Sequence, residues 1–119
     1  MMVAPLMISL LMAGQPAAGP ETQAGVAILA QSYDRCMATY AVRLTRTDAD
    51  DDRIFASATE GCRPLKDQLL AAIPREYPPD QARELVATIE ASARPNFLAM
   101  LQRIRADRAA RGGGDARNR

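Results

Sequence analysis

The chain has no histidine and no tryptophan, and it contains only two cysteines among 119 residues. Without histidine it cannot form a Ser/His or Cys/His catalytic pair, a c-type haem attachment or a His-ligated metal site. Two cysteines are too few for a four-ligand zinc site. Lysine occurs once, as Lys66, and no P-loop or Schiff-base motif surrounds it. The sequence therefore predicts no catalytic, cofactor-binding or metal-ligating residue.

The chain also has almost no excess of one sign of charge, since 15 basic and 14 acidic residues give a formal net charge of +1. Such a balance does not favour nucleic acid as a partner. The distribution is nevertheless uneven: 8 basic and 12 acidic residues lie up to Glu90, and 7 basic and 2 acidic residues follow. Every basic residue except Lys66 is an arginine, which indicates a GC-rich bacterial source.

An apolar, uncharged run of 11 residues, VAPLMISLLMA, opens the chain and is followed by the small residues of GQPAAGP. This run has the length of a signal-peptide core and is too short to span a bilayer. We expect residues 1–19 to form a signal peptide, cleaved within residues 13–24. The alternatives are an uncleaved membrane anchor, and a misread start or soluble tail. Export predicts a periplasmic or secreted protein, without a stable membrane span after cleavage.

Helical periodicity dominates the rest of the chain, and no strand-like alternation appears. An apolar series with 3-4 spacing predicts a helix over residues 22–46, and a second series predicts one over residues 50–73, kinked or divided near Gly61 and Pro64. The proline-rich IPREYPPD predicts a linker. A helix over residues 79–110 keeps its apolar phase across Pro95 and is therefore expected to be continuous but kinked. We predict an all-α, three- to four-helix bundle over residues 20–110 and a disordered basic tail over residues 111–119.

The two cysteines are placed symmetrically about the turn TRTDADDD, because the midpoint of positions 36 and 62 lies within it. Antiparallel helices on either side of that turn bring Cys36 and Cys62 to the same height. Both cysteines also lie on the expected inner faces. In an oxidising compartment, this placement predicts a Cys36–Cys62 disulfide, with two reduced thiols as the alternative.

The acidic run from Asp48 to Asp52 is the one stretch that resembles a calcium loop. Counted from Asp48, an EF-hand needs glycine at the sixth position and glutamate at the twelfth, but Arg53 and Thr59 occupy them. We therefore expect Thr47 or an aspartate to cap the following helix, with the remaining acids complementing its positive end.

Other candidate sites carry weak signals. Glu60 and Asp67 can share a helical face, as paired carboxylates for acid/base catalysis would require, but nothing in the sequence marks a cleft beside them. No serine lies in a G-x-S-x-G motif, including Ser32, Ser57 and Ser92. Tyr33 and Tyr40, seven positions apart, either line a ligand groove or pack in the core.

The segment after Glu90 combines arginines with an apolar stripe, a composition typical of amphipathic helices that bind anionic surfaces. We give its arginines as candidate partner-binding residues: Arg94, Arg103, Arg105 and Arg108. The alternative is that the apolar stripe packs on the hairpin while the arginines stay solvated. Binding of nucleic acid is disfavoured, because this segment contains one aromatic residue, Phe97.

The sequence thus predicts a small exported helical binding protein, chaperone-like or inhibitor-like, whose partner is a protein or an anionic envelope surface. Its format resembles in architecture that of periplasmic acid-stress chaperones and some immunity proteins. The alternatives are an enzyme or enzyme subunit that uses carboxylates, and a purely structural component of the cell envelope.

Overall fold

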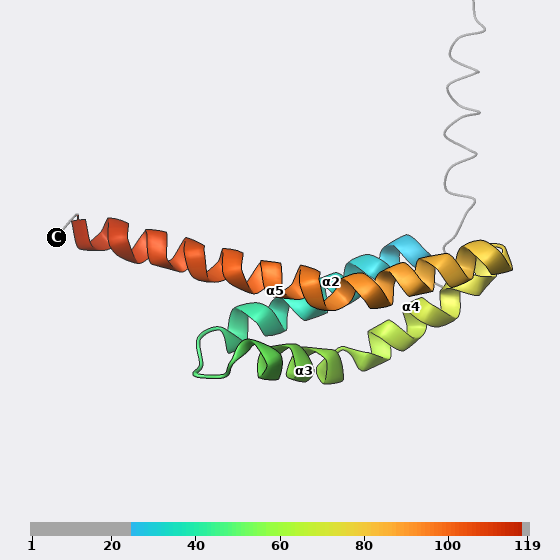
Figure 1. Cartoon of the computed structure of the whole chain (residues 1–119), viewed down its shortest axis with the longest axis horizontal. Coiled ribbons are helices and arrows are strands. Elements are labelled where there is room, and N and C mark those ends of the chain that lie inside the picture. Colours follow the sequence, from blue (N-terminus) through green and yellow to red (C-terminus); the bar gives the residue numbers. More distant parts are fainter. Residues whose placement is uncertain (1–24, 118–119) are drawn as a thin grey trace, which may run out of the picture.

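The computed structural model describes residues 25–117, which form four helices. These are α2 (Val26–Leu44), α3 (Asp51–Gly61), α4 (Arg63–Glu76) and α5 (Pro79–Arg117). The α2 helix forms one arm of a hairpin, and α3 and α4 follow one another along the other arm (Figure 1). The α5 helix runs back along the hairpin and projects beyond the α2–α3 turn. The predicted all-α fold, a disulfide-linked hairpin with a long C-terminal helix, is confirmed, and the predicted signal peptide at residues 1–19 lies outside the described residues.

The second arm of the hairpin is divided into two abutting helices, one of the two outcomes that the sequence left open. Cys62 lies at the division, with φ −102° and ψ 9°, as the C-cap of α3 and the N-cap of α4. Pro64 stands in the first turn of α4, where its missing N–H costs no helical hydrogen bond. The break therefore occurs where proline is tolerated.

The core lies where the apolar stripes of the four helices meet. Burying a leucine or isoleucine there contributes about 1.5–3 kcal/mol relative to leaving it exposed. Ala41 on α2 and Ala58 on α3 are completely buried, and their small side chains let these two helices approach closely. The largest fully buried side chains are Ile54, Leu69, Ile73, Leu101 and Cys62.

The disulfide predicted from the cysteine spacing is present. Cys36 of α2 and Cys62 at the α3–α4 junction are bonded, with their Cα atoms 6.0 Å apart. The bond joins the two arms of the hairpin and closes a loop with a sequence separation of 26 residues. It therefore fixes the height of α2 relative to the second arm.

Both ends of α2 are completed by side chains from other helices. At its N-terminus, the Val26 N–H donates to Oε2 of Glu76, on α4, at 2.7 Å. At its C-terminus, the Arg108 guanidinium of α5 donates to the Val42 carbonyl at 2.8 Å and to the Thr45 hydroxyl at 2.5 Å. These groups satisfy backbone atoms that a helix leaves unpaired, and each has the charge that complements its end of the helix dipole.

The aspartate run caps α3, as the sequence predicts. The Asp50 carboxylate accepts the Arg53 N–H at 2.8 Å. Asp51 and Asp52 lie in the first turn of α3, and both carboxylates form ion pairs with arginines of α5. Among residues 25–117, no group of three or more His, Cys, Asp or Glu side chains is arranged to hold a metal ion.

The α5 helix is continuous through Pro95, as its apolar phase predicts, and Figure 1 shows a shallow bend in its orange part. The helix ends at Arg117, beyond the predicted end near Ala110, so that most of the expected tail lies within it. No glycine of the described part has a positive φ, which means that none forms a left-handed helix stop. A glycine inside a helix lowers stability by about 1 kcal/mol relative to alanine but leaves the backbone hydrogen bonds possible.

Candidate binding cleft

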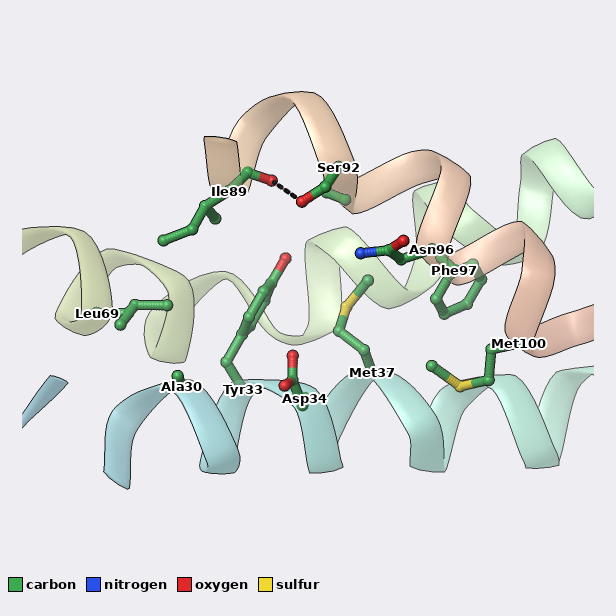
Figure 2. A pocket seen from close by; sticks show the side chains of 11 residues that line it. Ala30, Tyr33, Asp34, Met37, Leu69, Ile89, Ser92, Asn96, Phe97 and Met100 are labelled. Carbon is green, nitrogen blue, oxygen red and sulfur yellow. Dashed lines mark hydrogen bonds between the residues drawn. The ribbon is translucent and has the colours of Figure 1, made fainter. Parts of the chain in front are cut away.

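A cleft of about 270 Å³ opens between α2, α4 and α5 near the middle of the hairpin. Figure 2 shows side chains of α2 and α5 facing one another across it, with Leu69 of α4 at one end. The cleft is lined by Ala30, Tyr33, Asp34, Met37, Leu69, Ile89, Ser92, Ala93, Asn96, Phe97 and Met100.

The floor of the cleft is apolar and closely packed. Tyr33, Met37, Leu69 and Phe97 all belong to the buried core, each with at most 7% of its surface exposed. The Phe97 ring is held from behind by the Phe55 ring, whose centroid lies 5.5 Å away. Such a floor offers a preformed apolar surface to a ligand.

Polar groups of the cleft have hydrogen-bonding capacity left over. The Tyr33 hydroxyl, the Asp34 carboxylate and the Asn96 amide make no side-chain hydrogen bond within the described part of the chain. The Ser92 hydroxyl donates to the Ile89 carbonyl at 3.5 Å, a distance at which a hydrogen bond is weak (Figure 2). These groups are therefore available to a ligand's polar atoms.

One carboxylate sets the charge of the cleft. Asp34 has no ion pair within residues 25–117, and no lysine or arginine belongs to the lining. The nearby ammonium group of Lys66 is already paired with Glu90, with Nζ 3.0 Å from Oε1. The cleft thus carries a local negative charge that its own residues do not neutralise.

Both titratable groups of the cleft have a raised pKa. For Asp34, burial of the carboxyl group against the cleft wall raises the pKa above its ordinary value. For Tyr33, burial is again the largest cause; Lys66 lowers this pKa, while Glu90 and Asp34 raise it. The Asp34 carboxylate nevertheless remains exposed to solvent, so that it loses only part of its hydration at the cleft wall.

The four arginines proposed as partner-binding residues do not gather at this cleft. Arg94 pairs with Asp52 and lies over the Phe55 ring, with its Cζ 5.6 Å from the ring centroid. Arg105 pairs with Asp51 at 2.5 Å. Arg108 caps α2, and Arg103 is exposed.

The apolar stripe beside these arginines packs on the hairpin, where Phe97 and Leu101 are almost fully buried. The packing and the ion pairs match the alternative in which α5 covers the hairpin. That the arginines also bind a partner stays a prediction.

The other sequence candidates are dispersed. Tyr33 lines the cleft, but Tyr40 lies against Gly61, where an added Cβ would meet its hydroxyl at 2.0 Å. Glu60 pairs with Arg63 at 2.5 Å, and Asp67 is an exposed residue of α4 outside the cleft.

Sequence reasoning missed Asp34 and Asn96 as site residues. Asp34 directly follows a core tyrosine, and Asn96 directly precedes a core phenylalanine. Being next to a core residue in the sequence does not predict that Asp34 of α2 and Asn96 of α5 line the same cleft.

Comparison with known proteins gave no match to a family model, a curated protein or a solved structure. Within the described residues, no helix is both long and apolar enough to traverse a bilayer. The geometry of the cleft is consequently the main source of functional inference.

Proposed function

We propose that this chain is a small binding protein, periplasmic or secreted, that holds a ligand group with an apolar body and a polar head in the cleft between α2 and α5. The observation that carries this proposal is the combination of a packed apolar floor with polar groups whose hydrogen bonds are unused. Tyr33 is buried and Ser92 half-buried, whereas Asp34 and Asn96 are exposed, so that a ligand on the apolar floor has polar groups within reach at the edge of the cleft.

The size of the cleft limits the ligand. Pockets for drug-sized molecules measure about 300–1,000 Å³, and this cleft measures about 270 Å³. It suits a small molecule or a single side chain presented by a partner protein. The latter fits the chaperone-like or inhibitor-like role expected from the sequence.

A discrete ligand is better supported than an anionic envelope surface. Two arginines of α5 pair with carboxylates of α3, and a third caps α2, so that much of the cationic charge is used within the chain. A carboxylate enzyme also receives less support, because the cleft contains one carboxylate, Asp34, and no second acid or base beside it.

Export is supported by the disulfide. Structural disulfides persist in oxidising compartments and are rare in reducing ones. The Cys36–Cys62 bond joins two core elements, as expected for a structural bond. Thiol alkylation of the protein purified from its natural host tests this point: a protein isolated with both thiols free would contradict export.

The binding function is tested by titrating the ¹⁵N-labelled protein, residues 20–119, with hexanol and recording amide chemical shifts. We expect saturable shifts concentrated at residues of the cleft floor, such as Met37, Leu69 and Phe97. Ala93→Leu fills the cleft from α5 and should abolish them. Ala99→Leu adds the same volume at an exposed position of α5 outside the cleft and should leave them unchanged. Absence of saturable shifts, or equal shifts in Ala93→Leu, would refute the proposal.

A further inference from the structure

We propose that the cleft selects an organic cation, an alkylammonium group whose charge lies at Asp34 and whose stem lies on the apolar floor. This inference rests on the proposed function and adds the chemical class of the ligand. It depends on three features of the cleft: the sign of its charge, the kind of hydrogen-bonding atoms it offers and the apolar floor beside Asp34.

The sign of the charge is set by Asp34 alone. The Lys66–Glu90 pair beside the cleft is neutral as a unit, and no other charged residue lines the opening. An anionic ligand would be repelled by this carboxylate, and a neutral ligand would form no ion pair with it. A cation satisfies it by a charge-assisted hydrogen bond, which is stronger than a neutral one.

The hydrogen-bonding atoms also suit an ammonium group, which has three donors and no acceptor. Asp34 supplies carboxylate oxygens, and the hydroxyl groups of Tyr33 and Ser92 and the carbonyl of Asn96 supply further acceptors. Figure 2 shows Tyr33 and Asp34 projecting from α2 toward Ser92 and Asn96 on α5.

The short stem is accommodated by the rest of the lining. Met37 and Met100 project from α2 and α5 respectively, and Leu69 and Phe97 complete an apolar surface. Methionine side chains are flexible and polarizable, and they adapt to an aliphatic chain. The cleft therefore separates an acidic, polar part from an apolar part, as an amphipathic amine requires.

The environment of Asp34 supports this assignment. Asp34 is exposed, and partial desolvation at the cleft wall raises the pKa of its carboxyl group. A cation bound beside it would favour the ionised form of this carboxyl group.

The test compares three ligands that share one apolar chain: hexylammonium, hexanol and hexanoate. Amide shifts of the ¹⁵N-labelled protein are followed at pH 7 and low salt. We expect hexylammonium to bind about tenfold more tightly than hexanol, the ratio that one charge-assisted hydrogen bond supplies, and hexanoate to bind more weakly than both. Asp34→Asn should reduce the preference for the cation to less than about twofold. Asp107→Asn removes an exposed carboxylate from α5, far from the cleft, and should keep the full preference.

The outcomes separate this inference from the proposed function. If hexanol and hexylammonium bind equally well at the cleft, the cleft is a binding site without cation selectivity, and the inference is wrong while the proposed function stands. If none of the three ligands binds, both are wrong. Equal cation preference in Asp34→Asn and Asp107→Asn would also overturn the inference, because a group other than Asp34 would then bind the ammonium charge.

A fourth ligand, N-acetyl-lysine methylamide, distinguishes two sources of the same chemistry. It carries an alkylammonium group on a peptide backbone. Tighter binding than hexylammonium would identify the cation as a lysine side chain of a partner protein, and weaker binding would identify it as a free amine. In either case, the selectivity for an alkylammonium group is supported.

Discussion

Removal of the Cys36–Cys62 disulfide should lower the free energy of unfolding by about 3.5 kcal/mol. Two perturbations achieve this: the double variant Cys36→Ala/Cys62→Ala, and reduction of the unmodified protein. Reduction keeps the sulfur atoms in place, so that its effect isolates the cross-link. The double variant adds a cavity term, because Cys62 is only 1% exposed.

The magnitude follows from the length of the closed loop. With a sequence separation of 26 residues, the chain-entropy relation gives about 3.5 kcal/mol at 25 °C. The folded domain has about 90 residues, and domains of 60–100 residues shift their Tm by about 4–8 °C per kcal/mol. The reduced protein should therefore melt about 14–28 °C lower than the oxidised one. Since small domains are stable by about 5–15 kcal/mol, the reduced chain should still be folded at 25 °C.

The assay is urea denaturation followed by circular dichroism at 222 nm, with and without a phosphine reductant. Alkylation under denaturing conditions before reduction should find no free thiol in the oxidised sample. The reasoning would be refuted if oxidised and reduced protein unfolded at the same urea concentration, because the hairpin register would then be set by packing alone. A double variant that is much less stable than the reduced protein would measure the cavity at Cys62 separately.

Three further perturbations test the packing, the helix ends and the cleft. Gly61→Ala places a Cβ within 2.0 Å of the Tyr40 hydroxyl and should cost about 1–3 kcal/mol of unfolding free energy, whereas Gly112→Ala, with no atom within 4 Å, should raise it by up to about 1 kcal/mol. Glu76→Gln keeps an acceptor for α2 but removes the charge, and should lower stability by about 0.3–1 kcal/mol at low salt and less at high salt; a loss independent of salt would contradict the dipole argument. Asp34→Asn should raise the Tm slightly at pH 7, because partial burial raises the pKa of this exposed carboxyl group in the folded state, while solvent screening keeps the effect small. That gain should disappear as the pH falls through the raised pKa, and a variant less stable than the parent at pH 7 would refute it.

The parts of the fold that could be predicted are those determined by neighbouring residues. The hairpin follows from helical periodicity on either side of one polar turn, and the disulfide follows from equal helical rise on its two arms. Asp50 could be recognised as part of a capping run because an N-cap is a local contact. Whether Pro64 kinks a helix or divides it could not be decided, because both forms satisfy the same local rules.

The remaining features depend on the way α5 crosses the hairpin. The contact between Arg108 and the Val42 carbonyl joins residues 66 positions apart, and no sequence pattern relates them. The same holds for the position of Asp34, Ser92 and Asn96 around one cleft, which requires the register of α2 against α5. The cleft therefore became recognisable only when the packing of the helices was known.

The arginines of α5 show how one composition can support two different roles, and a matched pair of variants separates them. Arg108 is half-buried and donates to the last turn of α2, whereas Arg103 is exposed. Arg108→Gln should lower the free energy of unfolding by about 1–2 kcal/mol, through the lost charge-assisted hydrogen bonds and the lost complement to the helix dipole. Arg103→Gln should change it by less than about 0.5 kcal/mol.

Each of these variants removes one positive charge, so that any attraction of α5 to an anionic partner should fall equally in both. Binding to vesicles that contain anionic lipid measures this attraction, and urea denaturation measures stability. If stability differs between the variants while vesicle binding is equal or absent, Arg108 serves mainly the fold. If Arg108→Gln is as stable as the parent, the contact between Arg108 and α2 contributes nothing to stability. The prediction that the arginines of α5 form a partner-binding surface would then be favoured.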